Sequence, residues 1–384
     1  MATQDNRADA SARRGPDQDP HRSLHSEDEA RPGEHPGRSS NPLVKVAGLA
    51  WLEFEKPDLE AAERFLADFG FTVADRMPDL LVLRGRQATA PCLAVRRGPR
   101  AAFVGPAFQA AARDDLDRLA RGTGGAVTAH WGGHAVALRD PSGIAVRVVH
   151  GVPDLPGLPE RAPLPLNFGP APARVNATQR PARRPAEIER LGHVVLGTTR
   201  FSAALDWYLD TLGLIVSDFL YLDGQRERGP VMAFIRCDQG SMPTDHHTLA
   251  MLLGPHTGYV HSAYQLTDLD EVAASGAYLR EQGYRHAWGI GRHIQGSQIF
   301  DYWRDPDRLM FEHYADGDVF DASVPPGWAP LSASGLAQWG PRATAEFTGA
   351  RDPGTVVAAI KALRDKGNEI DFAALRGLVK AMSS

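Results

Sequence analysis

The sequence predicts an α+β protein made of two tandem domains, and three observations support that prediction. Residues 49–70 and 191–214 each contain a short apolar strand, an amphipathic helix and a glycine stop, in that order. Residues 138–150 and 303–315 each contain Arg-Asp-Pro, a turn signal, followed by another apolar strand. A proline-rich segment separates the two copies. A repeat this long indicates duplicated domains and excludes a solenoid of short repeats.

Composition divides the chain into five segments. Residues 1–44 are polar and nearly free of aliphatic side chains, so they cannot bury enough surface to offset the entropy of ordering, and we expect a disordered tail. Residues 151–187 hold nine prolines, which exclude a regular helix and indicate a linker. The expected order is a polar tail over 1–44, a first domain over 45–150, a linker over 151–187, a second domain over 188–318, and an extension over 319–384.

The extension is expected to begin as a loop and to end in helices. Pro325-Pro326-Gly-Trp predicts a loop near a pocket mouth. Asp352 and Pro353 suit the N-cap and first turn of a helix, and apolar residues follow at helical spacing. A second helix is expected over 371–382. We expect these helices to pack on their own chain, with a neighbouring subunit as the alternative.

Charge and cysteine content exclude several classes of protein. The 384 residues are 43% hydrophobic and 23% charged, which is typical of a globular protein. A net charge of −5 gives no reason to expect nucleic acid as a partner. Neither a secretory signal nor a run approaching about 18 apolar residues occurs, so no membrane partner is expected. The two cysteines, Cys92 and Cys237, fit a reducing compartment, and the prediction is a cytoplasmic protein.

Three ionisable residues stand in apolar strands of the second copy. His193 lies in Leu-Gly-His-Val-Val-Leu, His261 in Tyr-Val-His-Ser-Ala-Tyr, and Glu312 in Leu-Met-Phe-Glu-His-Tyr. A single strand histidine is more often a core residue than a ligand, but burying an unpartnered ionisable group is costly, and three such strands occur together. Two imidazoles and one carboxylate form the donor set that holds Fe(II) on one face and leaves the other open. We therefore predict a metal centre for Fe(II), with Mn(II) as a possible substitute.

The first copy serves as an internal control for this prediction. When the copies are aligned on their glycine stops, His193 corresponds to Ala50. When they are aligned on their Asp-Pro turns, Glu312 corresponds to Arg147. The first copy therefore lacks counterparts of His193 and Glu312, the first and last of the three predicted ligands. The fold alone does not require ligands at these positions. The first domain is therefore expected to be structural.

A longer motif lies in residues 291–312. It contains His293, a tyrosine nine residues later at Tyr302, an Asp-Pro turn, and then Glu312. This pattern resembles the signature of the vicinal oxygen chelate (glyoxalase/bleomycin resistance) superfamily and, within it, of the type I extradiol ring-cleaving dioxygenases. The resemblance covers roughly residues 45–318. It implies two tandem domains of paired β-α-β-β-β modules curled around a metal.

The resemblance also implies a role for each matching residue. It implies His193, His261 and Glu312 as metal ligands, His247 as acid/base, and His293 and Tyr302 as donors to substrate and oxygen. An imidazole suits proton transfer in both directions because its ordinary pKa is near neutrality. His246 remains the alternative to His247, since adjacent strand residues face opposite ways.

The activity implied is that of a non-haem Fe(II)-dependent extradiol dioxygenase. Such an enzyme inserts both atoms of O2 into a catechol and cleaves the ring next to the hydroxyls, in aromatic-compound catabolism. Trp288 stands where relatives that select a carboxylate carry arginine, so we expect an uncharged substrate. Relatives assemble into dimers or larger rings, so a homo-oligomer is expected. The alternatives are a glyoxalase-like lyase or isomerase and a metal-free, drug-sequestering protein of the same fold.

Overall fold

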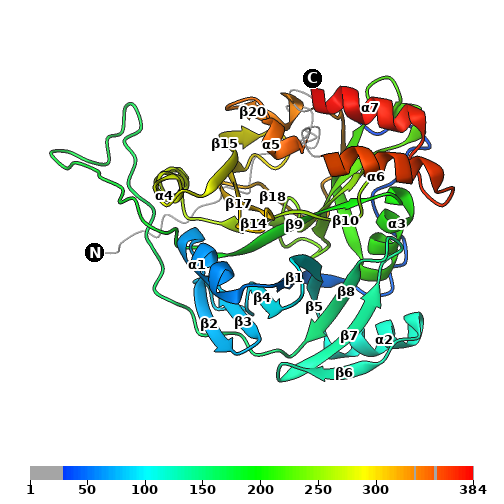
Figure 1. Ribbon diagram of the computed structural model, residues 1–384, viewed down its shortest axis with the longest axis horizontal. Helices are drawn as coiled ribbons and strands as arrows, with labels where there is room; N and C mark the ends of the chain where they lie inside the picture. The colour runs from blue at the N-terminus through cyan, green and yellow to red at the C-terminus, as the bar shows by residue number, and fades with distance from the viewer. Residues whose placement is uncertain (1–28, 333, 350–352, 384) are drawn as a thin grey trace, which may run out of the picture.

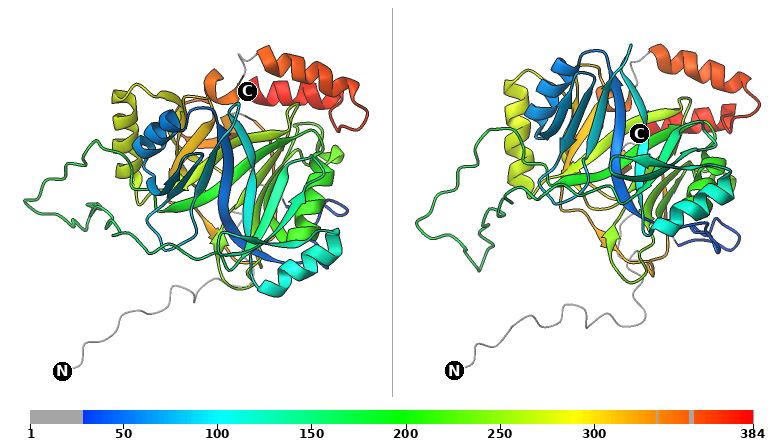
Figure 2. Two further views of the ribbon diagram at one scale, coloured as in Figure 1. Left: turned by 60° about the horizontal axis from the view of Figure 1, so that its bottom comes forward. Right: turned by 90° about the horizontal axis from the view of Figure 1, so that it is seen from below.

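Two curved β-sheets with helices on their outer faces make up the body of the protein (Figures 1 and 2). The computed structural model describes residues 29–332, 334–349 and 353–383. Within these residues, no helix is both long enough and apolar enough to cross a lipid bilayer.

The first sheet is built from two copies of a β-α-β-β-β module. Its strands lie in the order β2-β3-β4-β1-β5-β8-β7-β6, and the antiparallel pair β1 and β5 joins the two modules. Asp58 caps the first helix by accepting a hydrogen bond from the backbone of Ala61, and Gly70 ends it at a φ of 120°. The elements are β1 (Val46–Lys56), α1 (Leu59–Phe69), β2 (Thr72–Met77), β3 (Leu80–Arg84), β4 (Leu93–Arg97), β5 (Ala102–Ala110), α2 (Arg113–Thr123), β6 (Val127–His130), β7 (Gly133–Arg139) and β8 (Ala145–His150).

The second domain repeats this plan. Its core strands lie in the order β10-β11-β13-β9-β14-β17-β16-β15, with the antiparallel pair β9 and β14 at the centre. The elements are β9 (Arg190–Thr198), α3 (Phe201–Leu212), β10 (Leu214–Tyr221), β11 (Met232–Cys237), β12 (Thr244–Asp245), β13 (Leu249–Leu253), β14 (Gly258–Gln265), α4 (Leu269–Glu281), β15 (Arg285–His293), β16 (Ile299–Arg304), β17 (Met310–Ala315) and β18 (Val319–Phe320). The predicted α+β fold of paired modules is confirmed.

The C-terminal extension adds a strand to each edge of the second sheet. Strand β19 (Gly327–Pro330) pairs with β10, so the loop predicted at Pro325-Pro326-Gly-Trp is wrong from Gly327 onward. Burying the whole of Trp328 stabilises this strand. Strand β20 (Ala337–Trp339) pairs with β15, and helices α5 (Ala345–Thr348), α6 (Pro353–Arg364) and α7 (Phe372–Ser383) follow.

The two long C-terminal helices pack on their own chain, as predicted. Glu369, which lies between them, accepts hydrogen bonds from the backbone and hydroxyl of Ser202 at 2.9 Å. Asp371 pairs with Arg228 at 2.7 Å. Small and aliphatic side chains of α6 and α7, Ala362 among them, are buried in the same core as the second sheet.

Residues 29–44 lie against the second domain, so the prediction of an unstructured tail is wrong for this stretch. The backbone carbonyl of Gly37 accepts a hydrogen bond from Val216 at 2.7 Å. Glu34 pairs with the buried Arg226 at 2.8 Å, and Val44 is buried. Composition missed this because the segment is held by backbone pairing and by polar side-chain contacts, without an apolar core of its own. Residues 1–28 lie outside the described residues.

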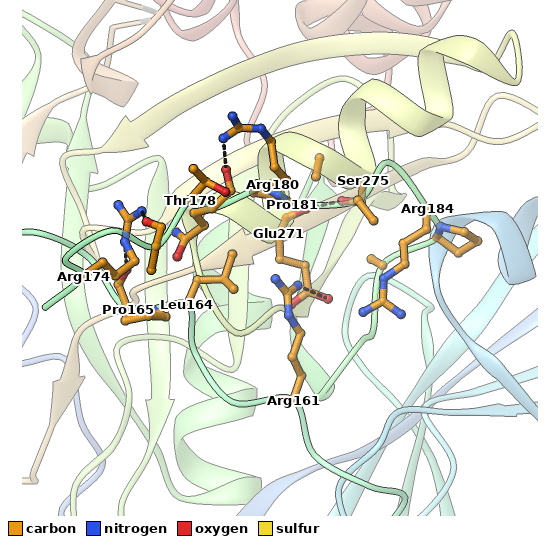
Figure 3. Close-up of a pocket in the computed structure, with 16 residues that line it drawn as sticks. Arg161, Leu164, Pro165, Arg174, Thr178, Arg180, Pro181, Arg184, Glu271 and Ser275 are labelled. Carbon is orange, nitrogen blue, oxygen red and sulfur yellow. Dashed lines mark hydrogen bonds and ion pairs between the residues drawn. The ribbon is translucent and has the colours of Figure 1, made fainter.

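The proline-rich linker leaves the body of the molecule beside α4 and returns to it (Figures 1 and 2). Apart from one isolated bridge, residues 151–187 form no helix or strand. Arg161 anchors the linker to Glu271 of α4 at 3.3 Å. The linker and α4 enclose a hollow of about 540 Å³ that is lined by several arginines (Figure 3). None of the predicted site residues lines this hollow.

A buried ion pair and a cluster of aromatic rings join the two domains. Lys56, at the end of β1, contacts Asp305 and Asp307 in the Asp-Pro turn of the second domain, the latter at 2.8 Å. Lys56 and Asp305 are each only 1% exposed. The ring of Phe54 lies 6.0 Å from that of Phe311, so the first domain packs directly against β17.

Replacing Lys56 with methionine should destabilise the protein strongly. The substitution leaves Asp305 buried without its cation, which costs about 3–5 kcal/mol. The matched control is Lys45→Met, because Lys45 is 52% exposed and its pair with Asp238 is worth about 1 kcal/mol at most. Urea unfolding followed by tryptophan fluorescence measures both variants. Equal losses of stability would contradict the assigned role of the buried pair.

Candidate metal centre

Three neighbouring strands bring the predicted ligands to one face of the second sheet. Ala263 of β14 lies opposite His193 on β9 and opposite Glu312 on β17. His261 precedes Ala263 by two residues and therefore projects from the same face of β14. The three ligands thus surround a residue whose side chain is a single methyl group. That small side chain leaves space for an ion above the sheet.

The donor atoms are spaced as ligands of one ion would be. The Nε2 atoms of His193 and His261 lie 3.3 and 3.2 Å from Oε2 of Glu312. One donor atom from each residue lies within 4.8 Å of the others. Neighbouring ligands of an octahedral ion, each about 2.1 Å from it, are roughly 3 Å apart. The predicted ligand set is therefore brought together.

The chemistry of this donor set fits a divalent cation. Glu312 is fully buried, and neither of its carboxylate oxygens has a hydrogen-bond partner among the described residues. Burial alone would raise the pKa of Glu312, but the two histidines hold it well below its usual range. Burial lowers the pKa of His261. An ionised carboxylate and neutral imidazoles are the states that bind a metal, and Fe(II) and Mn(II) both suit them.

The first domain has the same pairing of its three central strands as the second, but it lacks the metal-binding side chains. Ala107 lies opposite Trp51 and Arg147, just as Ala263 lies opposite two of the ligands. Trp51 therefore corresponds to the first histidine ligand, and the expected correspondence to Ala50 is wrong. The helix lengths explain the error: α3 has 12 residues and α1 has 11, so an alignment on the glycines that end them displaces the preceding strands by one residue.

An internal ion pair occupies the corresponding place in the first domain. Arg147 takes the position of Glu312, as predicted, and its Nε lies 2.9 Å from Oε1 of Glu53. Trp51 donates a hydrogen bond to the same oxygen at 3.1 Å. Burial raises the pKa of Glu53, but Arg147 lowers it further, so the carboxylate is ionised. Among the described residues, only the triad of the second domain forms a possible metal cluster.

A small cavity of about 60 Å³ opens over the triad. The predicted residues His247, His293 and Tyr302 line it together with the two histidine ligands. Two amide side chains and five apolar ones complete the wall: Gln295, Gln298, Val195, Met232, Phe234, Leu336 and Phe347. Leu336 and Phe347 come from the C-terminal extension, which the sequence analysis left outside the site. No motif identified them, because their role depends on how the chain folds back over β15 and β16.

His293 and Tyr302 form a hydrogen-bonded pair at the cavity. Nδ1 of His293 donates to the carbonyl of Leu336 at 2.7 Å, since a carbonyl can only accept. Nε2 of a neutral His293 must then accept from the Tyr302 hydroxyl at 2.8 Å. Burial lowers the pKa of His293 to about 4, so the ring is neutral at pH 7. The Trp288 ring is stacked against Tyr302 at 5.7 Å, and its indole donates to the backbone of Pro341.

His247 lines the cavity, and its neighbour His246 does not. The Nδ1 atoms of the two rings lie 3.0 Å apart, and Nε2 of His246 lies 2.5 Å from Oδ2 of Asp218. Burial lowers the pKa of His247 well below its usual value, and the neighbouring imidazoles add to this effect. The sequence analysis missed Asp218. The available signal was a carboxylate in the apolar strand Leu-Ile-Val-Ser-Asp-Phe-Leu.

Comparison with known proteins agrees with this geometry. The sequence profile of the Glyoxalase/Bleomycin resistance protein/Dioxygenase superfamily matches residues 190–313. Metapyrocatechase 2 of Cupriavidus necator is 32% identical over 312 residues, which cover 79% of this chain and 92% of that protein. An iron-dependent extradiol dioxygenase of Rhodococcus jostii is 28% identical over 158 residues, covering 39% of this chain and 50% of that protein.

Solved structures share the fold at lower identity. Homoprotocatechuate 2,3-dioxygenase of Brevibacterium fuscum has a TM-score of 0.64 at 18% identity, covering 82% of this chain and 95% of that chain. A Mn(II)-bound glyoxalase of Novosphingobium aromaticivorans has a TM-score of 0.65 at 21% identity, covering 79% and 94%. Because both activities occur on this fold, the similarity in sequence decides between them. The chain belongs to the glyoxalase/bleomycin resistance protein/dioxygenase superfamily, as an extradiol ring-cleaving dioxygenase of the catechol 2,3-dioxygenase type.

Proposed function

We propose that His193, His261 and Glu312 hold Fe(II), and that the enzyme cleaves an uncharged, one-ring catechol next to its hydroxyls. The observation that carries this proposal is the convergence of three donor atoms within 4.8 Å at the base of a cavity. In this assignment the second domain carries the chemistry, and the first domain supports β17 through Phe54 and Lys56.

The residues around the cavity supply proton transfer and hydrogen bonds. Bound Fe(II) supplies the electron transfer that lets triplet dioxygen react with a closed-shell ring. Nε2 of His247 takes a proton from a catechol hydroxyl and later returns it to an oxygen atom, because a buried neutral imidazole serves as a base. The Tyr302 hydroxyl lies at the cavity, and rotating its one hydrogen away from Nε2 of His293 lets it donate to developing oxygen charge.

The cavity wall supports an uncharged and compact substrate. No lysine or arginine is among the described residues that line the cavity. Trp288 stacks behind Tyr302 and offers no charge to a carboxylate. Phe347 lies 4.9 Å from the ring of Tyr302, measured between centroids, and narrows the space beside it. Together these features favour a catechol with a small apolar substituent over one with an acidic or second aromatic group.

We further propose a homo-oligomer in the cytoplasm. Phe168 and Val175 of the linker, and Val357 and Phe372 of the C-terminal helices, are more than half exposed. Contact with a second copy would bury this apolar surface. Cys92 and Cys237 are both free and buried, which agrees with a reducing compartment. Analytical ultracentrifugation of the full chain measures the oligomeric state.

Replacing Glu312 with glutamine should abolish iron binding and ring cleavage together. The amide has no charge to offset the cation, so bound iron should fall to below about a tenth of the wild-type content. Iron is measured after anaerobic reconstitution, and cleavage is measured as oxygen uptake and yellow product with catechol. The matched control is Glu53→Gln in the first domain, which should keep wild-type iron. Full iron in Glu312→Gln would remove the triad assignment.

Replacing His247 with phenylalanine should leave iron binding intact and slow the reaction. Loss of a general acid/base lowers kcat by about 100- to 10,000-fold. Iron content should stay near the wild-type value, because His247 is not one of the converging ligands. Steady-state oxygen uptake gives kcat, and a variant with wild-type kcat would refute the acid/base role.

Replacing Phe347 with alanine should widen the substrate range. Removing the ring opens the cavity beside Tyr302, and contacts of this size change kcat/KM by about 10- to 200-fold. We expect kcat/KM for 2,3-dihydroxybiphenyl to rise relative to that for 3-methylcatechol. An unchanged ratio of the two values would show that Phe347 does not limit the substrate.

A further inference from the structure

Three buried polar groups form a hydrogen-bonded chain that ends at the cavity. Asp218 of β10 lies 2.5 Å from Nε2 of His246, and Nδ1 of His246 lies 3.0 Å from Nδ1 of His247. Asp218 and His246 are each 1% exposed, and His247 is 4% exposed. Only His247 lines the cavity. Along this chain, the other two residues reach the cavity through His247.

The chain has a direction that follows from hydrogen-bond chemistry. The carboxylate of Asp218 accepts, so Nε2 of His246 carries a hydrogen. In the neutral ring, Nδ1 of His246 is then an acceptor, and Nδ1 of His247 must donate to it. Nε2 of His247, on the other side of that ring, is left with a free lone pair. The base proposed for the catechol proton is this same atom.

The fold places this chain through local irregularities. The register of β10 against β11 shifts between Val216 and Asp218, and such a bulge redirects the side chain that follows it. The Ser217 hydroxyl donates to the carbonyl of His246 at 2.5 Å. Gly296 has a φ of 78°, and a Cβ there would lie 3.0 Å from Nδ1 of His246. The backbone of residue 296 thus packs closely against the ring and restricts its movement.

We propose that Asp218, acting through His246, is a positioning residue that fixes the Nδ1–H tautomer of His247. The inference rests on the proposed role of His247 as acid/base. A carboxylate behind a catalytic imidazole holds one tautomer and one ring orientation without touching the substrate. Here the imidazole of His246 stands between the carboxylate and His247. The negative charge of Asp218 therefore lies on β10, away from the cavity wall.

The protein also contains a histidine–aspartate pair away from the cavity, which serves as a control for a purely structural role of Asp218. The pair His286 and Asp301 shows what a structural contact of this kind looks like, because Nε2 of His286 lies 2.7 Å from the fully buried Asp301 carboxylate. The other oxygen of Asp301 accepts from the Trp303 indole at 2.8 Å. None of these three side chains lines the cavity. Asp301→Asn is therefore a matched control for Asp218→Asn.

The experiment is a double-mutant cycle in the iron-loaded full-length enzyme with catechol as substrate. In the wild-type background, Asp218→Asn should lower kcat by about 10- to 100-fold while KM and iron content stay near wild type. In the His247→Phe background, the same change should lower kcat by less than about twofold, because the residue it acts through is gone. Asp301→Asn should keep kcat within about twofold in the wild-type background.

A second pair of variants keeps the test sharp if Asp218→Asn folds poorly. The amide oxygen of His246→Asn occupies the place of Nδ1 and still accepts from His247, whereas His246→Leu offers no acceptor. His246→Asn should keep at least about tenfold more kcat than His246→Leu. Equal kcat in these two variants would overturn the inference.

Two further outcomes separate this inference from the proposed function. If Asp218→Asn lowers kcat by the same factor with and without His247, the residue is structural and the inference fails while ring cleavage stands. If His247→Phe keeps wild-type kcat, the acid/base assignment fails, and the positioning role fails with it. The ring-cleaving activity itself is tested separately by oxygen uptake in the wild-type enzyme.

Discussion

The buried carboxylate of Glu312 is the constraint on which the rest of the second domain depends. A fully buried, ionised carboxylate without hydrogen-bond donors is costly unless a cation faces it. Imidazoles bind a metal in their neutral form, so the ion itself is the cation that faces Glu312 in the loaded site. The sheet must therefore hold three strands in a fixed register around Ala263. The core formed with the first domain, including Phe311 beside Phe54, stabilises this arrangement.

The duplicated frame solves the same electrostatic problem in two ways. In the second domain the counter-charge is a metal ion that binds from solution. In the first domain it is the guanidinium of Arg147, which pairs with Glu53 and belongs to the chain. The concave face there is filled by Trp51, whose ring stacks on that of Trp131 at 4.7 Å. One copy thus keeps an open site for chemistry, and the other is closed and provides support.

Sequence reasoning succeeded wherever the signal was local. Helical apolar patterns, glycine stops and Asp-Pro turns predicted the duplicated domains, the family resemblance implied their paired modules, and ionisable residues in apolar strands predicted the triad. It failed where helix length or spatial neighbours decide the outcome. The correspondence to Ala50 missed the extra residue in α3, and the tail prediction missed the docking of residues 29–44. Phe347 contacts the site only after folding, so neither spacing nor composition could assign it, whereas Asp218 carried a local signal that was missed, a carboxylate in an apolar strand.

The hydrogen bond from His293 to the Leu336 carbonyl connects the C-terminal extension to the cavity over the metal triad. The tautomer of a residue in the family motif is thereby set by a peptide group some forty positions downstream of it. An active fragment of this protein must consequently extend beyond the two duplicated domains and include this segment. Gene fusions or exchanges that preserve both modules but replace this segment would carry the metal ligands intact and still lose the proton arrangement around them.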